Sequence, residues 1–175
     1  MRSLAFLLFL FAYALPFEVA AQGGTSVPTP SEFHGFDIGQ HYIITSSVID
    51  YYRMLGERSP RVVYEEYGRS IQGRPLPMVI VGSEENLGRR VEIREAIRRL
   101  TNPLTSMGEG ELQELLDGLP ALVWVFIVDT DEEAGVNVLQ EVAQELATRE
   151  DAEARSIREN VLLILTPLTN PDSHA

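Results

Sequence analysis

The chain has 175 residues, with 26 acidic side chains against 14 basic ones and a formal net charge of −12 at pH 7. A charge this negative argues against nucleic acid and anionic membrane surfaces as partners. All 14 basic residues are arginine, and there is no cysteine. The missing lysine excludes P-loop, Schiff-base and serine–lysine chemistry, and the missing cysteine excludes disulfides, thiolate metal ligands and a thiol nucleophile.

The first 31 residues are expected to lie outside the folded domain. Residues 1–21 start with a basic Arg2, continue through an apolar run and end in the small residues Ala20 and Ala21. This is the pattern of a secretory signal peptide, and its apolar run is too short to span a bilayer. Residues 22–31 read as a linker rich in Gly, Thr, Ser and Pro. We therefore expect an exported protein, periplasmic or extracellular, with no transmembrane span and a folded part over residues 32–175.

Hydrophobic periodicity predicts helices that alternate with strands along the rest of the chain. The helices are expected at 45–58, 84–100, 109–116, 131–148 and 151–158, and the strands at 61–67, 76–81, 121–128 and 161–165. This order indicates an α/β fold with a mixed, mainly parallel sheet and flanking helices. The unbroken apolar run Ala121–Val128 predicts a strand buried on both faces. Trp124 and the pair Tyr51 and Tyr52 are expected in the core.

An acidic cluster follows the 121–128 strand directly, with Asp129, Asp131, Glu132 and Glu133 in five residues. Ligands and catalytic groups of α/β sheets gather at the carboxyl ends of strands, so a functional site is expected here. Two interpretations stay open. Thr130 and Glu133 match a helix capping box, and acids in a first helical turn stabilise the helix. Alternatively, the carboxylates of Asp129 and Glu132 are of the type that binds a metal ion.

Four short patterns occur in a fixed order along the chain. They are Ser-Pro-Arg-Val at 59–62, Gly-Arg-Ser-Ile-Gln-Gly-Arg-Pro at 68–75, the strand end at 129–135 and Asn-Pro-Asp at 170–172. Together they resemble the amino-terminal part of the catalytic domain of the zinc carboxypeptidase family, the carboxypeptidase A-like metallopeptidases. The resemblance covers about 30–173 and implies a truncated domain of this fold. We interpret Arg74 and the Asn-Pro-Asp segment as turn-forming rather than as site residues.

The resemblance implies a Zn²⁺ ion, a peptide or protein substrate, and removal of a carboxy-terminal residue by zinc-activated water. The family's strand-end H-x-x-E unit supplies two zinc ligands. Glu132 falls on its Glu, whereas Asp129 stands at the position of its His, and Gly135 falls on the following Gly. The family's second ligand His, catalytic Glu and substrate-binding Arg would lie beyond Ala175. No catalytic residue is therefore expected in this chain, its substrate-binding residues are unknown, and the chain alone is expected to be inactive.

Two other functions remain as alternatives. In the first, the chain is a non-catalytic or decayed fragment that docks a partner chain on an exposed sheet edge formed by Val161–Leu165. A more remote alternative is an Asp-x-Asp phosphatase, with Asp129 as nucleophile and Asp131 as acid around Mg²⁺. Against the phosphatase, Glu133 stands where that motif has Thr or Val, and there is no lysine to hold a phosphoryl group. The three histidines, His34, His41 and His174, fall at no ligand position of the carboxypeptidase pattern.

Overall fold

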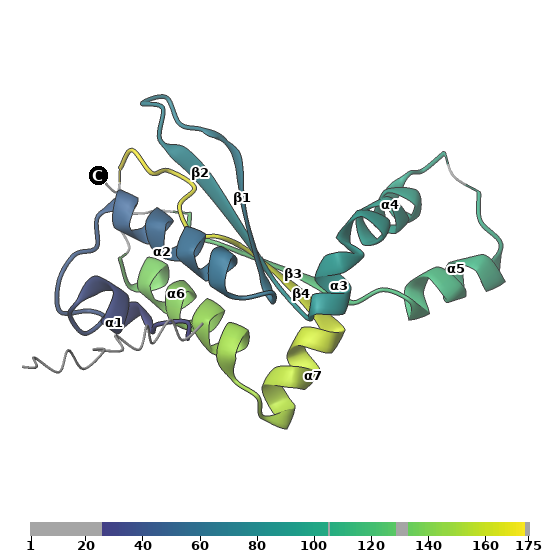
Figure 1. Ribbon diagram of the computed structural model, residues 1–175. Helices are drawn as coiled ribbons and strands as arrows, with labels where there is room; N and C mark the ends of the chain where they lie inside the picture. Colours follow the sequence, from purple (N-terminus) through teal and green to yellow (C-terminus); the bar gives the residue numbers. More distant parts are fainter. Residues whose placement is uncertain (1–25, 105, 129–132, 174–175) are drawn as a thin grey trace, which may run out of the picture.

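The computed structural model of the chain describes residues 26–104, 106–128 and 133–173 (Figure 1). The expected signal peptide lies outside the described residues. A four-stranded sheet stands at the centre, with its strands in the spatial order β1-β2-β4-β3. The strands are β1 (Val62–Arg69), β2 (Pro75–Val81), β3 (Ala121–Phe126) and β4 (Val161–Thr166).

Helices flank this sheet, so the expected α/β class with a mixed sheet is confirmed. The described sheet is not mainly parallel, however, because β3 pairs with β4 in parallel whereas β1 with β2 and β2 with β4 pair antiparallel. The helices are α1 (Pro30–His34), α2 (Thr45–Arg58), α3 (Glu84–Gly88), α4 (Arg90–Thr101), α5 (Glu109–Asp117), α6 (Glu133–Thr148) and α7 (Ala152–Asn160). The single helix expected over 84–100 is instead divided into α3 and α4 at Arg89, whose φ of −98° and ψ of 16° are not helical. The last two residues of the expected linker belong to α1, which Thr29 and Glu32 start with a reciprocal capping box.

Strand β4 is an inner strand of the sheet. It pairs antiparallel with β2 on one side and parallel with β3 on the other, so that Ile164 lies opposite Ile80 and opposite Trp124. The expectation that Val161–Leu165 forms an exposed edge is therefore wrong. The crossover through α6 and α7 returns the chain between β2 and β3, and β3 becomes the edge in the described part of the sheet. Order along the sequence does not determine order in space.

The main core lies between one face of the sheet and the helices α1, α2 and α6 (Figure 1). Tyr51 and Tyr52 of α2 are fully buried there, as expected from the sequence. In β2 the alternate residues Val79 and Val81 are buried against these helices, whereas Ile80 on the opposite face is partly exposed. This period of two shows that only one face of the sheet is fully covered.

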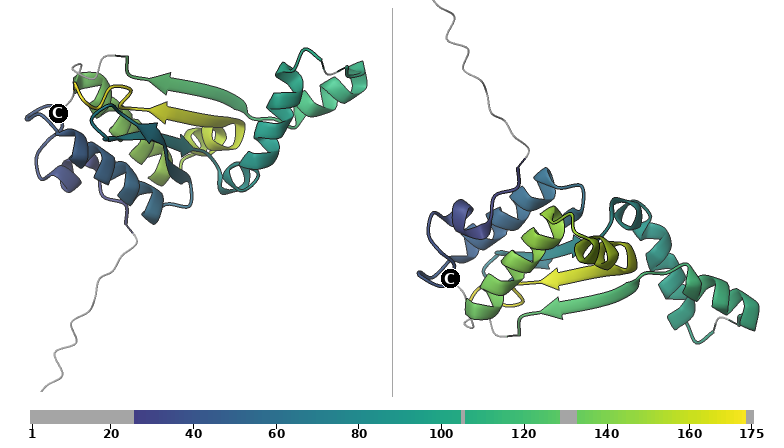
Figure 2. Two further views of the ribbon diagram at one scale, coloured as in Figure 1. Left: turned by 90° about the horizontal axis from the view of Figure 1, so that it is seen from above. Right: turned by 90° about the horizontal axis from the view of Figure 1, so that it is seen from below.

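Strand β3 departs from the prediction of burial on both faces. The side chain of Trp124 is 62% exposed, and Leu122 and Phe126 on the same face are also exposed. Figure 2 shows β3 at the margin of the sheet, with α4 and α5 extending away from it. An apolar run indicates that its residues favour burial, but the segments that would cover them lie elsewhere in the sequence.

The two buried tyrosines of α2 give a matched test of this core. Tyr51 Oη donates a hydrogen bond to the carbonyl oxygen of Pro28 at 3.2 Å, whereas Tyr52 Oη has no partner among the described residues. Because an unpaired buried hydroxyl loses its hydration without compensation, Tyr52→Phe should raise the free energy of unfolding by ~1 kcal/mol. Tyr51→Phe should lower it by ~1 kcal/mol, since it leaves a carbonyl unpaired. Urea denaturation monitored by circular dichroism measures both, and changes of the same sign would contradict this account.

Candidate functional site

The candidate site lies where β3 ends and α6 begins. The described chain reaches Val128 two residues after β3 and resumes at Glu133, the first residue of α6. Asp129 and Glu132, the metal-binding candidates, fall between these points and lie outside the described residues, as does Asp131. The described residues on either side of them are the end of β3, which pairs with the inner strand β4, and the start of α6. This is the end of an α/β sheet at which ligands gather.

The loop that follows β4 is tied to the end of β3. The backbone N–H of Ile127 donates to the carbonyl oxygen of Thr166 at 3.3 Å. The hydroxyl of Thr169 donates to the carbonyl oxygens of Ile127 and Val128. Indole Nε1 of Trp124 donates to Thr166 Oγ1 at 3.0 Å. The segment that leads into residue 129 is thus held by side chains from the neighbouring strand and its loop.

Two of the sequence motifs meet at Asp172. Its Oδ1 accepts hydrogen bonds from Ser70 Oγ and from Arg74 Nη1, both at 2.7 Å, and its Oδ2 accepts one from the backbone N–H of Gln72 at 3.2 Å. The β1–β2 turn is thereby clamped to the loop after β4. Arg74 is engaged in this clamp, in agreement with its interpretation as a structural residue.

The donors around Asp172 also change its acidity. Partial burial acts to raise the pKa of the carboxyl, but the hydrogen bonds from Ser70 and Arg74 and the backbone N–H of Gln72 oppose it. The net result is a pKa below the usual range of an aspartate, since all these donors stabilise the charged form. The clamp therefore favours the ionised carboxylate.

The start of α6 packs closely against the end of β3. A Cβ atom on Gly135 would lie 2.7 Å from Cδ1 of Ile127, so the glycine permits this approach. One carboxylate oxygen of Glu133 and the amide oxygen of Asn137 are buried and have no partner within the described chain. Residues i and i+4 share a helix face, so these two oxygens lie on one side of α6. Sequence reasoning missed Asn137, although its spacing from Glu133 was a usable signal.

His34 and His41 are the two histidines that lie among the described residues. Nδ1 of His34 lies 3.0 Å from Oγ of Ser47, and its Nε2 lies 2.8 Å from Oε1 of Gln140. The imidazole thereby joins α1, α2 and α6. An amide oxygen only accepts, so we assign the hydrogen to Nε2, with Nδ1 accepting from the hydroxyl. His41 packs edge-on against Phe36, and His174 lies outside the described residues. No group of three or more His, Asp or Glu that could hold a metal occurs in the part of the chain that the structure describes.

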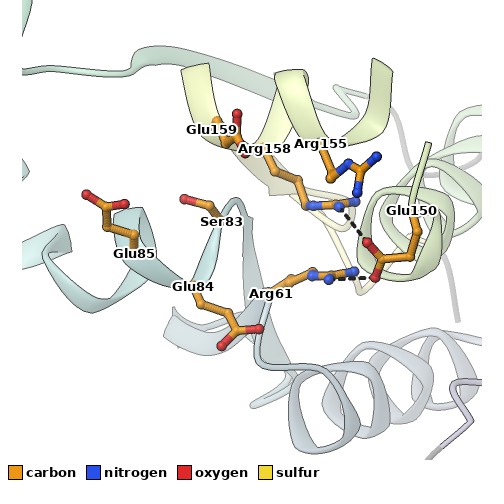
Figure 3. Close-up of a pocket in the computed structure, with 8 residues that line it drawn as sticks. All are labelled: Arg61, Ser83, Glu84, Glu85, Glu150, Arg155, Arg158 and Glu159. Carbon is orange, nitrogen blue, oxygen red and sulfur yellow. Dashed lines mark ion pairs between the residues drawn. The ribbon is translucent and has the colours of Figure 1, made fainter. Parts of the chain in front are cut away.

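A polar pocket of about 350 Å³ lies at the opposite end of the sheet (Figure 3). Glu150 forms ion pairs with two arginines: its Oε1 lies 2.6 Å from Nη2 of Arg61, and its Oε2 lies 3.7 Å from Nη2 of Arg158. Nη1 of Arg158 also donates to the carbonyl oxygens of Leu146 and Arg149 at 2.8 and 2.7 Å. Burial and the nearby Arg61 cation lower the pKa of Arg158. These contacts satisfy the last carbonyls of α6, so we interpret the cluster as a helix cap.

Comparison with known proteins identifies the class to which this arrangement belongs. The described fold is of the α/β class, and the family model described as zinc carboxypeptidase matches residues 48–174. No curated protein matches the chain. Because the family match covers most of the sequence, the chain belongs to the zinc carboxypeptidase family. None of the described helices has both the length and the apolar composition needed to cross a bilayer.

The Asp172 clamp predicts an acid-dependent contribution to stability. A carboxylate with a lowered pKa in the folded state stabilises the fold above its unfolded pKa of about 3.9, and this contribution is lost as pH falls through the folded pKa. Asp172→Asn should therefore lower the urea midpoint at pH 7, and the difference from wild type should shrink as the pH is lowered to about 3. Asp50→Asn on the exposed surface of α2 is the matched control. A difference for Asp172→Asn that does not change with pH would refute the electrostatic role.

Proposed function

We propose that this chain is an exported metallocarboxypeptidase-family protein in which Asp129 and Glu132 form the strand-end part of a zinc site. The observation that carries the proposal is the family match, which includes the interval between β3 and α6. Further support comes from Gly135 and from Ser70, Arg74 and Asp172, which occupy motif positions and make packing or clamp contacts. Peptides or proteins with a free carboxyl terminus are the corresponding substrate class.

The residues present fit zinc by donor type. Carboxylate oxygens bind Zn²⁺ at about 2.0–2.2 Å, so both Asp129 and Glu132 are chemically suitable ligands. The unpaired oxygen of Glu133 adds a further carboxylate atom near the start of α6. When bound in such a site with an open position, zinc lowers the pKa of a coordinated water to about 7. Asp129 and Glu132 would hold the ion, and Thr169 and Gly135 would position the end of β3.

The donor set is poorer than that of an active family member. Asp129 replaces an imidazole with a carboxylate, and His34 uses both of its ring nitrogens in the contact between α1, α2 and α6. A catalytic zinc site ordinarily has three protein ligands, and the motif resemblance implies two positions in this sequence, Asp129 and Glu132. We therefore propose that this chain by itself binds zinc weakly and does not hydrolyse peptides.

Export is the remaining part of the proposal. It rests on the signal-peptide pattern of residues 1–21, with cleavage after Ala21, followed by a linker and the folded part over residues 32–175. A periplasmic or extracellular location follows from such a signal. Non-catalytic binding is the second candidate function, and the exposed apolar face of β3 favours it.

Zinc titration by isothermal calorimetry tests the metal site. Glu132→Ala should abolish the binding heat because it removes the ligand that matches the family. Asp129→His should lower the dissociation constant by about tenfold, since it restores the imidazole of the family pattern. Glu145→Ala removes an exposed acid elsewhere on α6 and should leave binding unchanged. If none of the four proteins, Asp129→His included, produces binding heat, the acids serve only to cap α6 and the zinc proposal is wrong.

The absence of peptidase activity is tested on a model peptide that is blocked at its amino terminus and has a free, apolar carboxy-terminal residue. We expect the purified chain to release no carboxy-terminal amino acid in the presence of zinc, measured by mass spectrometry over hours. Release that stops on addition of a chelator would show instead that the site is catalytically competent.

A further inference from the structure

The polar pocket at the end of α6 holds more charged groups than the capping of this helix requires (Figure 3). Arg61, Glu150 and Arg158 make the contacts of the cap. Arg155 of α7 also lines the pocket, and its side chain makes no hydrogen bond or ion pair with any residue that the structure describes. The pocket therefore presents a cation that a ligand can engage.

Three carboxylates of the same pocket are likewise without an ion pair in the described chain. They are those of Glu84 and Glu85 in α3 and of Glu159 in α7. Three arginines and four glutamates line the pocket, so its net charge is −1. Because one guanidinium and three carboxylates are unpaired, the pocket complements a ligand that carries one anionic group and two cationic groups.

The positive and negative groups are separated in space. Figure 3 shows the three guanidinium groups on one side of Ser83 and the carboxylate of Glu85 on the other. Arg158 is only 4% exposed. Burial lowers the pKa of its guanidinium, and the cations of Arg61 and Arg155 act in the same direction. An anion bound beside Arg155 and Arg158 would relieve this repulsion, so the anionic end of a ligand belongs on the arginine side.

The pocket is built by segments that lie between Arg61 and Glu159, and it needs no covering element. Its wall groups are charged, and charged side chains are ordinarily exposed to water. The last described residues lie at the other end of the sheet, where Asp172 holds the β1–β2 turn. A volume of about 350 Å³ is within the range of sites that receive a small molecule.

We propose that this pocket binds a free basic α-amino acid such as arginine or lysine. The α-carboxylate of the ligand faces Arg155 and Arg158. Its α-ammonium and its side-chain cation face the three unpaired glutamates. Neutral amino acids lack the second cation, so the pocket discriminates against them by charge. This site does not depend on zinc, and it lies at the end of the sheet remote from the interval between β3 and α6.

The probe is L-arginine, titrated into the isotopically labelled chain and followed by heteronuclear NMR spectroscopy. Saturable shifts should appear at the backbone amides of Ser83, Arg155 and Glu159. Three analogues each lack one charged group: agmatine has no carboxylate, N-acetyl-arginine has no α-ammonium and norvaline has no guanidinium. Each should bind about fivefold more weakly than L-arginine, as expected for the loss of one partly exposed ion pair.

Single variants of the pocket complete the test. Arg155→Ala should weaken the binding of L-arginine about fivefold but should not weaken that of agmatine, which has no carboxylate to place there. Glu159→Gln should weaken both ligands. Arg94→Ala and Glu114→Gln are matched controls, because they remove exposed charges on α4 and α5 outside the pocket, and they should leave binding unchanged.

Two results would overturn the proposal. The first is equal affinity for L-arginine and norvaline, or shifts that spread over the surface without saturation. Either would show unselective attraction of a cation to a chain with a net charge of −12. The second is an Arg155→Ala variant that binds L-arginine as tightly as the unmodified chain, since the carboxylate would then have no partner in this pocket.

Discussion

The rest of the structure depends on strand β4 having a neighbour on each side. Leu162 and Leu163 are almost fully buried and Leu165 is completely so. Such a strand needs hydrogen-bond partners along both of its backbone edges. Pairing with β2 and β3 provides these partners, and it also determines where the following loop must go. From that loop, Thr169 reaches the end of β3 and Asp172 reaches the β1–β2 turn.

The two ends of the sheet consequently have different roles. At one end Arg61, Glu150 and Arg158 form a compact ion cluster that satisfies the last carbonyls of α6. At the other end the polar contacts involve loops, and those of Thr169 reach the end of β3. Family motifs in these loops hold the backbone in place, whether or not a metal is bound.

The open side of β3 sets a separate constraint. A flat apolar edge strand with exposed aromatic side chains is prone to association unless it is paired or covered. Nothing charged interrupts β3 to oppose such pairing.

Local patterns in the sequence determined the secondary structure and the class of the fold. The helix Thr45–Arg58 and the strand that begins at Ala121 follow from periodicity and from apolar runs, because these report on the nearest neighbours along the chain. Motif order indicated the family, and the acids after the strand indicated where a site would be. Tertiary structure alone decided that β4 is an inner strand, that Trp124 is exposed and that Asp172 unites two distant motifs. Strand order and burial depend on which segments meet in space, and the sequence of one segment carries no information about its partners.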